Sequence, residues 1–333
     1  MRINYRSIAD LSNDVKKWIR KLPRDLDLIV GIPRSGMLVA LLLSLFMNLP
    51  VTDVEGFLEG KIMKAGRRLE KKWAEINQKR RLKVLVVDDS VLDGFEMNRV
   101  KNTIYGAQLQ HEVYYGAVYV TPEGANYVDF FYEVVETPRI FEWNIWHHSI
   151  LEDSCVDLDG VLCRDPLPEE DDNGERYLKF IKNAEPLIIP SVTIGCIVTC
   201  RLEKYRKETE EWLKKHGIHY RKLIMLDLPS SDIRRALGIH SKFKAAIYKT
   251  ENAKLFIESS RSQALEIARL TGKPVYCAET NEMINPDAIR HLRESTIREM
   301  KVILNRPDKF LKHAMIAFRR RILLLKYKLL GKL

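Results

Sequence analysis

Short apolar runs alternate along the chain with longer charged segments, and this alternation limits the fold more than any other feature of the sequence. The first series of strand-like runs lies at 26–31, 83–89, 111–120 and 128–135. A second series lies at 156–162, 194–201, 222–227, 254–260 and 273–277. Apolar runs of this length, separated by helix-like segments, are typical of parallel sheets that helices cover. The sequence therefore predicts an α/β protein.

The chain is long enough for two such sheets. At 333 residues it exceeds what one hydrophobic core usually serves, so we expect two domains. We place the first at 1–148 and the second at 149–298, with the aromatic segment 138–150 at their junction and a basic tail at 299–333. The predicted fold class is two parallel-sheet α/β domains followed by a C-terminal amphipathic helix.

Cysteine usage and the apolar segments indicate the compartment. The five cysteines are an odd number without the spacing of a disulfide framework, which predicts a reducing environment. The first 14 residues carry charge throughout and lack the apolar core of a secretory signal. The most apolar run, 37–47, has 11 residues, whereas a membrane-spanning helix needs about 20. We therefore expect a buried core helix at 37–47 and a cytoplasmic protein.

The positive charge of the chain is concentrated in its last segment. Residues 301–333 contain ten Lys or Arg and one acid, so they carry nine of the ten net positive charges. Apolar residues recur there at intervals of three and four, namely Leu311, Met315, Phe318, Ile322, Leu325 and Leu329. A helix with this pattern can lie on an anionic membrane surface through residues 305–333. A helix packed on the protein or in a coiled coil is the alternative, and nucleic-acid binding is least expected because the rest of the chain is nearly neutral.

Two adjacent acids, Asp88 and Asp89, follow a continuous apolar run at 84–87. Such a run predicts a buried strand, whose carboxyl end lies in the crevice where open α/β sheets bind ligands. Gly94 then precedes a helix-like segment, an arrangement that aims backbone N–H groups at an anion. The turn GIPRSG at 31–36 follows another strand and adds an arginine. An isolated acid pair is often only a surface turn, but these neighbours favour a binding site.

Together these residues resemble the phosphoribosyltransferase fold that uses phosphoribosyl pyrophosphate, PRPP, over residues 20–140. The resemblance implies that Asp88 and Asp89 contact the ribose hydroxyls and stabilise the positive charge that develops on the sugar. It implies Mg²⁺ as the cofactor, which neutralises the leaving pyrophosphate. The pyrophosphate site that it implies is made by Gly31, Arg34, Ser35 and Gly36. A basic mobile hood over the site would correspond to Lys61, Lys64, Arg67 and Arg68.

The sequence departs from that family in the loop expected to cradle the 5-phosphate, where Asp93 and Glu96 flank Gly94. The family usually carries Thr or Ser at the positions of these two acids. Two carboxylates repel a phosphate dianion unless a cation or a turned-away rotamer intervenes, although the backbone amides at 92–95 can still donate to it. We therefore expect this chain to bind the 5-phosphate differently, or to have an altered or weakened first site.

A second acidic motif, VDLDGVLC, places Asp157 and Asp159 at the end of another apolar run, before Gly160. Residues two apart share a face of a strand, and a turn at the strand end can bring both acids to one ligand. Such a pair is weak evidence alone, but with the glycine it resembles the first motif of haloacid-dehalogenase-type phosphatases. The later motifs of that family follow in order, and they match Thr199, Lys244 and Glu258.

This second resemblance implies a covalent mechanism. Asp157 would attack phosphorus to form an aspartyl phosphate, and Asp159 would protonate the leaving oxygen and later activate water. Thr199 and the third-motif lysine would hold the phosphoryl oxygens and offset their charge. Lys244 is the expected lysine, and Lys242 is its close competitor.

Mg²⁺ is expected in this second site at Asp157, Asp159 and Glu258. Arg201 either contacts the substrate or forms a surface salt bridge. Thr199 follows Asp159 by only 40 positions, which leaves room for no more than a minimal cap. We therefore expect an open mouth, which suits a phosphate on a bulky molecule.

Two sites of these kinds in one chain predict a bifunctional enzyme. The first domain would transfer a 5-phosphoribosyl group from PRPP to an acceptor, and the second would remove the 5-phosphate to leave a ribofuranose. The basic tail favours a lipid-linked or surface glycan as the acceptor, at the inner face of a membrane. One alternative is a nucleobase phosphoribosyltransferase joined to a nucleotide phosphatase. Another is a PRPP-binding module without catalysis, which Asp93 and Glu96 favour.

Overall fold

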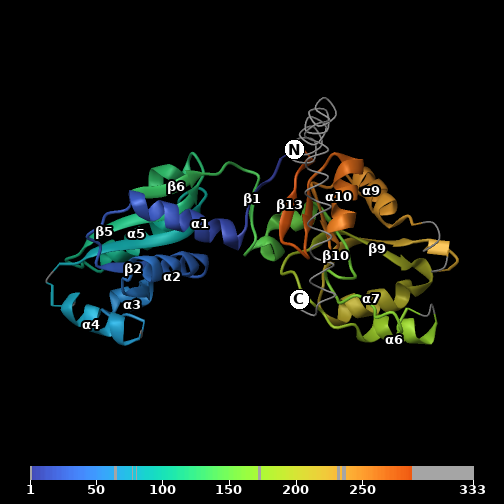
Figure 1. The fold of residues 1–333 in the computed structure, drawn as a ribbon, viewed down its shortest axis with the longest axis horizontal. Coiled ribbons are helices and arrows are strands. Elements are labelled where there is room, and N and C mark those ends of the chain that lie inside the picture. Colours follow the sequence, from blue (N-terminus) through green and yellow to red (C-terminus); the bar gives the residue numbers. More distant parts are fainter. Residues whose placement is uncertain are drawn as a thin grey trace, which may run out of the picture.

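The computed structural model describes residues 2–63, 66–76, 78–79, 81–171, 174–230, 233–234 and 238–286. This part of the chain forms two lobes, each with a sheet at its centre (Figure 1). The strands of both sheets run parallel, except for one antiparallel strand at the edge of the second sheet. The predicted α/β class with parallel sheets is confirmed.

The N-terminal sheet has five parallel strands in the order β3, β2, β4, β5 and β6. These strands are β2 (Leu28–Gly31), β3 (Val51–Asp53), β4 (Lys83–Val91), β5 (Glu112–Val120) and β6 (Phe130–Val134). The four runs of the first predicted series are all strands. The short strand β3 is additional, because its three residues are too few to form a recognisable apolar run.

Helices cover both faces of the N-terminal sheet. They are α1 (Ile8–Trp18), α2 (Ser35–Met47), α3 (Val54–Leu58), α4 (Arg67–Ile76) and α5 (Phe95–Gly106). Alternate residues of a strand point to opposite faces, so Ile29 and Leu85 pack with α1 and α2. Their neighbours Leu28 and Val84 pack on the other face with α3, α4 and α5. Because side chains alternate between the two faces of a strand, the apolar residues of each strand are divided between two core layers.

Helix α2 contains the apolar run 37–47, for which we expected a buried core helix. One side of the helix is buried against the sheet through Val39 and Leu43. On the other side Leu45 is 75% exposed and Phe46 is 40% exposed. The expected helix is present and one side of it belongs to the core, whereas its other side is exposed because α2 covers the outside of a sheet.

The C-terminal sheet has the order β10, β9, β8, β11, β12 and β13, with β13 antiparallel to β12. Its strands are β8 (Ser154–Val156), β9 (Ile194–Leu202), β10 (Tyr220–Leu226), β11 (Leu255–Glu258), β12 (Val275–Cys277) and β13 (Glu282–Ile284). Each of the five runs in the second predicted series overlaps one of the strands β8 to β12. The first run shares only one residue, Val156, with β8.

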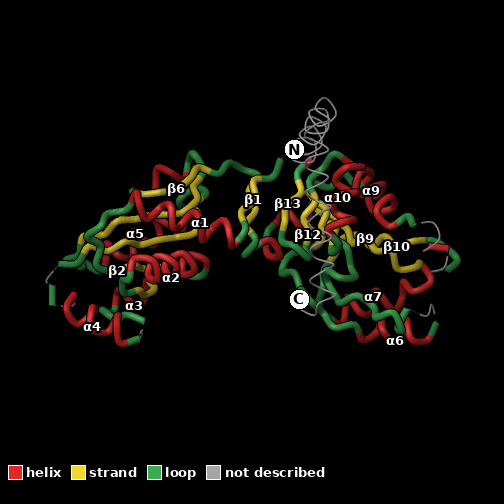
Figure 2. Tube along the Cα trace, viewed as in Figure 1, coloured by secondary structure: helices red, strands yellow, loops and turns green. Residues whose placement is uncertain are grey.

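Two pairs of helices enclose this second sheet (Figure 2). They are α6 (Glu175–Asn183), α7 (Arg206–Lys215), α9 (His240–Thr250) and α10 (Arg261–Thr271). Phe180 of α6 and Trp212 of α7 belong to the core layer on one face. Tyr248 of α9 and Ile267 of α10 belong to the layer on the other face. All five cysteines are free and buried within this lobe.

A two-stranded parallel ribbon, β1 (Asn4–Arg6) with β7 (Arg139–Phe141), connects the two lobes (Figure 1). Ile3, just before β1, packs into the core of the C-terminal lobe. The ring of Tyr5 lies 5.7 Å from that of Tyr276, and its hydroxyl donates to the carbonyl of Asn281 at 2.8 Å. The start of the chain is thus part of the C-terminal lobe's packing.

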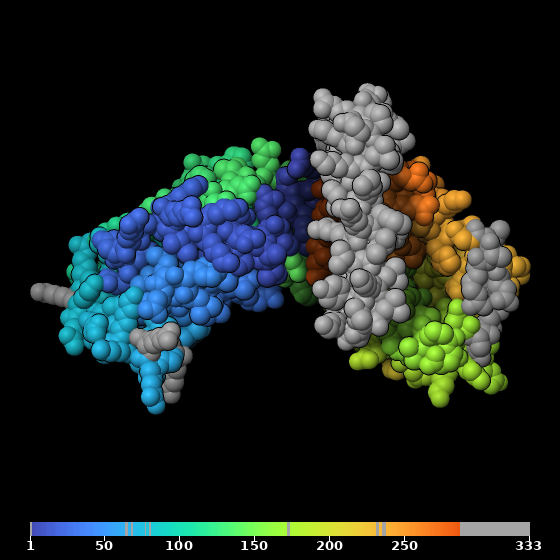
Figure 3. Space-filling view, in the orientation of Figure 1, coloured from blue at the N-terminus to red at the C-terminus, as the bar shows by residue number. Residues whose placement is uncertain are grey.

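Five short 3₁₀ helices complete the described secondary structure. They are η1 (Ile19–Lys21), η2 (Gly124–Tyr127), η3 (Ile145–His147), η4 (Ser149–Asp153) and η5 (Glu203–Tyr205). In the space-filling view the N-terminal lobe runs from blue through cyan to green, and the C-terminal lobe from yellow-green to orange (Figure 3). The amphipathic tail predicted at 299–333 lies outside the described residues, and the division at 148 and 149 stays a prediction. None of the described helices combines the length and apolar character that a bilayer span requires.

Candidate active sites

The first candidate site lies at the point where the strand order of the N-terminal sheet reverses. Strand β2 has β3 on one side and β4 on the other, and such switch points form the ligand crevices of open α/β sheets. Gly31, the last residue of β2, pairs with Val87. Strand β4 continues beyond this pair, so Asp88 and Asp89 lie past the end of β2 and beside the turn that follows it.

The two adjacent acids have different surroundings. Asp89 is buried, and it accepts hydrogen bonds from the hydroxyl of Ser35 at 2.6 Å and from the indole nitrogen of Trp143 at 2.8 Å. Asp88 accepts from the backbone N–H of Asp89 and lines a pocket. Burial and the carboxyl of Asp89 raise the pKa of Asp88 to about 9. Both acids were expected to contact a ribose, and in this structure Asp88 is the one that faces the pocket.

The turn after β2 packs tightly against β4. A Cβ atom on Gly36 would lie 2.7 Å from the carbonyl oxygen of Val87 and 3.0 Å from a carboxyl oxygen of Asp88. A glycine is therefore needed for this approach. Ser35 reaches Asp89, whereas Arg34 is exposed at the start of α2. The structure thus brings the turn and the acid pair together, as the sequence predicted.

The loop that departs from the family pattern begins helix α5. The carboxylate of Asp93 accepts the backbone N–H of Phe95, the first residue of the helix, at 3.1 Å. Its negative charge therefore lies at the N-terminus of the helix dipole. Glu96 forms an ion pair with Arg99 at 2.7 Å. Asp93 is therefore bonded to a helix amide, and Glu96 is paired with a cation. A cation beside a loop carboxylate reduces the repulsion that we expected this loop to exert on a phosphate.

A pocket of about 310 Å³ opens between this loop and the acid pair. It is lined by Asp88, by residues 90–97 and by Arg139 of β7. We did not predict Arg139 or Trp143, because both lie in the aromatic segment that we interpreted as a junction. The signal available was weak: Arg139 precedes the apolar pair Ile140 and Phe141, but Glu142 follows in the same segment, so the arginine did not stand out as an unpaired charge.

The structure describes only part of the predicted hood. Lys61 is exposed and paired with Glu59 at 2.6 Å. Arg67 is exposed at the first position of α4. Lys64 and the side chain of Arg68 lie outside the described residues. A basic hood therefore stays a prediction.

Replacing Gly94 with alanine should destabilise the N-terminal lobe by about 2 to 4 kcal/mol. Gly94 has a φ of 78°, and an added Cβ would overlap the ring of Tyr127. Gly106, at the other end of α5, has open space around it, so Gly106→Ala is the matched control and should change the free energy of unfolding little. Chemical denaturation of both variants measures this; equal stability would contradict the assigned backbone conformation.

The second candidate site also lies where the strand order of its sheet reverses. Strand β8 lies between β9 and β11, and all three contribute to the site near their carboxyl ends. Asp157 follows β8 directly, Thr199 lies in β9, and Glu258 ends β11. The backbone N–H of Asp157 donates to the carbonyl of Ile257 at 2.9 Å, which fixes the two acidic ends beside each other.

Lys244 joins the two acids. It comes from α9, is 3% exposed, and its ammonium lies 2.8 Å from a carboxyl oxygen of Asp157 and 2.7 Å from one of Glu258. Burial lowers the pKa of Lys244, but the two neighbouring carboxylates outweigh this effect and raise it above its ordinary value. Lys242 is exposed on the same helix. The structure therefore brings Lys244 to the acids and leaves its competitor at the surface.

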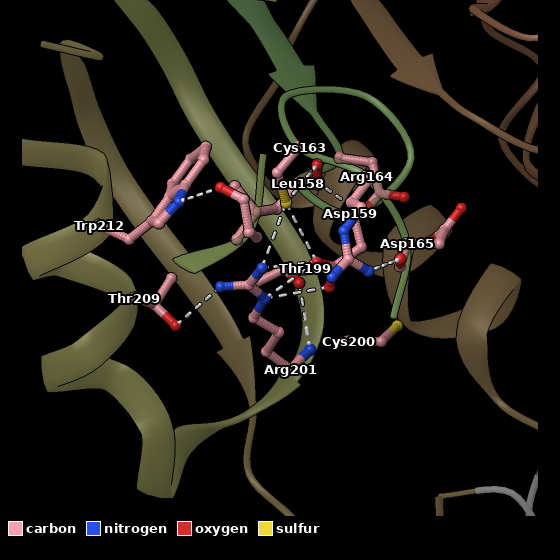
Figure 4. A network of polar contacts seen from close by, with 12 residues as sticks. Leu158, Asp159, Cys163, Arg164, Asp165, Thr199, Cys200, Arg201, Thr209 and Trp212 are labelled. Atoms are coloured by element: carbon pink, nitrogen blue, oxygen red, sulfur yellow. Dashed lines mark hydrogen bonds and ion pairs between the residues drawn. The ribbon is translucent and has the colours of Figure 1, made fainter. Parts of the chain in front are cut away.

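Arg201 holds the second acid of the motif (Figure 4). Its side chain is fully buried. Two of its three guanidinium nitrogens, Nε and Nη2, lie 3.1 and 2.6 Å from the carboxylate of Asp159. Its backbone N–H donates to the Thr199 hydroxyl at 3.1 Å, and its Nη1 contacts the Thr209 hydroxyl. Arg201 thus forms its salt bridge in the interior of the lobe, whereas the alternative to substrate contact was a salt bridge at the surface. Substrate contact by Arg201 stays a prediction.

Carboxylate oxygens are the donors that Mg²⁺ prefers, so the predicted ligands of the second site suit the metal by type. Their arrangement does not. The ammonium of Lys244 lies between Asp157 and Glu258, and Asp159 is directed to Arg201. Among the residues that the structure describes, no group of three or more His, Cys, Asp or Glu side chains surrounds a common point. The three acids as placed here do not fit one shared metal ion.

The segment between the two motifs is small. In the part of 160–193 that the structure describes, the only α-helix is α6. Tyr177 and Phe180 of this helix are buried in the core of the lobe. These observations agree with the minimal cap expected from the spacing.

Comparisons with solved structures give similarity to the N-terminal part of the chain. No family model and no curated protein matches the chain. Among solved structures, it is similar to the xanthine-guanine-hypoxanthine phosphoribosyltransferase of Helicobacter pylori, with 18% identity and a TM-score of 0.33, over 43% of this chain and 95% of that one. It is also similar to a purine phosphoribosyltransferase from Pyrococcus horikoshii Ot3, with 18% identity and a TM-score of 0.32, over 43% and 94%. Similarity at this level identifies no activity, so the functional reasoning depends on the side chains of the two sites.

Proposed function

We propose that the N-terminal lobe transfers a 5-phosphoribosyl group from PRPP to an acceptor. The observation that carries this proposal is the placement of Asp88, which lies near the switch point of the sheet and lines a pocket together with the start of α5. The N-terminus of that helix presents backbone N–H groups, which suit a phosphate-bearing end of the donor. Asp89 fixes the turn through Ser35 and so supports Asp88.

The transfer needs little covalent chemistry from the protein. The bond between C1 of the ribose and the pyrophosphate breaks, and the electron pair leaves with the pyrophosphate. Positive charge then develops on the ribose ring, where the carboxyl of Asp88 can stabilise it in its ionised form, because a positive charge beside the carboxyl counteracts the effects that raise its pKa. The acceptor oxygen bonds to C1 and releases its proton to solvent or to the pyrophosphate. Mg²⁺ bound to the donor supplies charge neutralisation for the leaving group.

We further propose that the C-terminal lobe removes the 5-phosphate from the product. An oxygen of Asp157 bonds to phosphorus, and the sugar oxygen leaves with a proton from Asp159; water then cleaves the aspartyl phosphate. Lys244 supports this role because it contacts Asp157 and can also neutralise phosphoryl oxygens. In this structure the carboxylate of Asp159 is paired with Arg201, so Asp159 must take up a proton and turn from Arg201 before it can protonate the leaving oxygen.

The proposed acceptor is a lipid-linked or surface glycan, with the enzyme held peripherally on the inner face of the membrane by residues 305–333. The support is the amphipathic pattern of that segment in the sequence. A second support is the apolar edge of the pocket, where Leu92 is 51% exposed and Phe95 is 70% exposed. Apolar side chains of this kind can pack against the face of a sugar ring.

Pyrophosphate release tests the transfer. The full-length protein is incubated with PRPP, Mg²⁺ and either synthetic lipid-linked glycans or free purine bases. We expect glycan-dependent release with the wild type and a loss of about 100-fold or more in Asp88→Asn. Asp25→Asn is the matched control, because Asp25 is an exposed acid at the opposite end of the sheet, paired with Lys83. Release with purine bases alone would favour the nucleobase enzyme, and no release with any acceptor would overturn the transfer.

A further inference from the structure

Arg139 is a buried cation without a partner at the first site. It is 9% exposed, and its Nη1 atom is buried with no hydrogen-bond partner. No ion pair of its side chain is found among the described residues, although its guanidinium carbon lies 5.5 Å from the centre of the Phe141 ring. A buried, unpaired guanidinium is costly, so a native site that keeps one usually supplies an anion from a ligand.

The side chain lines the same pocket as the N-terminus of α5. Burial lowers the pKa of Arg139, whereas Asp89 and Asp88 raise it, so the two acids alone do not remove the cost of burying it. Two other acids of this pocket already have donors, since Asp93 accepts a helix amide and Glu96 pairs with Arg99. Arg139 is therefore the cation left for a ligand in the described lining of the pocket.

A phosphate group fits this arrangement best. A guanidinium binds two phosphate oxygens at once through its planar fork of N–H groups. The first turn of the 12-residue helix α5 also lines the pocket, and the N–H groups of a first turn have no partner within the helix. The N–H of Phe95 donates to Asp93, which leaves those of Glu96 and Met97 for an anion. The helix end and the guanidinium thus line one pocket, and their charges offset the carboxylates nearby.

We propose that Arg139 is the anion-binding side chain of this pocket and that it receives a phosphate monoester there. The inference rests on the proposed function only in taking the phosphate as the 5-phosphate of PRPP. It places a positive charge for this phosphate on strand β7, outside the loop at 92–96, which is acidic in this chain. The guanidinium offsets part of the repulsion that the two loop carboxylates exert on the phosphate.

Calorimetric titration with ribose 5-phosphate tests the inference on the full-length protein. Arg139→Gln should weaken binding by about 10- to 100-fold, because it removes a charge-assisted pair of hydrogen bonds. Arg139→Lys keeps the charge without the fork and should give an intermediate value. Lys83→Gln is the matched control, since it removes one cation from the opposite end of the same sheet, and it should bind as the wild type does.

A second variant tests the inference even if substitutions of Arg139 prevent the protein from folding. Asp93→Asn keeps an oxygen that can accept the N–H of Phe95, but it removes a negative charge from the pocket, so ribose 5-phosphate should bind about 3-fold tighter or more. Titration with pyrophosphate separates the two phosphate positions. Equal binding of ribose 5-phosphate by wild type and Arg139→Gln, or a loss confined to pyrophosphate, would overturn the inference.

The inference and the proposed function fail in different ways. Binding of ribose 5-phosphate that depends on Arg139, without any acceptor-dependent loss of PRPP, would leave the anion site standing and sink the transferase. Acceptor-dependent transfer with unchanged ribose 5-phosphate binding in Arg139→Gln would support the transferase and overturn the role given to Arg139.

Discussion

Asp157→Asn should reduce phosphate release from the phosphoribosylated product by on the order of 10⁴-fold. An amide cannot form the aspartyl phosphate, and the substitution keeps the size of the side chain. Lys244 retains its pair with Glu258, so the fold should persist. The measurement is inorganic phosphate release from purified product or ribose 5-phosphate, with mass spectrometry of the acceptor after reaction with PRPP. The variant should accumulate acceptor that still carries the 5-phosphate.

The matched control is Asp153→Asn, at the other end of the same strand. Asp153 is exposed and pairs with Lys254, so this change removes a carboxylate from β8's far end without touching the site. Phosphate release should stay within about 2-fold of wild type, since isolated surface pairs contribute little. If Asp157→Asn releases phosphate as fast as the control, the covalent mechanism is wrong.

Arg201→Gln should lower the free energy of unfolding by about 3 to 5 kcal/mol. The substitution leaves the carboxylate of Asp159 without its buried counter-charge, and it also removes the contact with the Thr209 hydroxyl. Urea denaturation of the whole chain, followed by tryptophan fluorescence, provides the measurement. Trp212 is buried in the same lobe and reports on its core.

Two further variants decide whether the loss comes from the buried pair. In Arg201→Gln with Asp159→Asn, neither charge remains, so about half or more of the lost stability should return. Arg206→Gln removes a half-exposed arginine that pairs with Glu203 and Glu210, and it should cost less than about 1 kcal/mol. A loss as large in Arg206→Gln as in Arg201→Gln would show that burial of the pair is not the cause.

Local features of the sequence were enough to place the acids of both candidate sites on or directly after strands. Asp88 follows the apolar run 84–87 within β4, and Asp157 follows Cys155 and Val156 of β8. The order of the strands then brings the separate motifs together. The proximity of Asp157, Thr199 and Glu258 follows from three neighbouring strands, although the sequence alone does not state which strands are neighbours.

The partners that come from elsewhere in the chain were not predictable in the same way. Arg139 and Trp143 reach the first site from a segment that follows the last strand of its sheet, so no periodic pattern marks them. The choice between Lys244 and Lys242 depends on which face of α9 meets the sheet. The burial of Arg201 depends on the packing of α6 and α7 against β9, which a single sequence does not reveal.

The ribbon of β1 and β7 has a consequence for dissecting the protein. A fragment that begins at residue 149 would lack Ile3 and Tyr5, and the C-terminal lobe would expose the apolar surface that these side chains cover. A fragment that ends at residue 148 would keep the ribbon but leave the same side chains exposed to water. Autonomous folding of the halves therefore requires the first six residues to be supplied to the second half, for instance by circular permutation, and their omission should produce aggregation rather than a separate phosphatase.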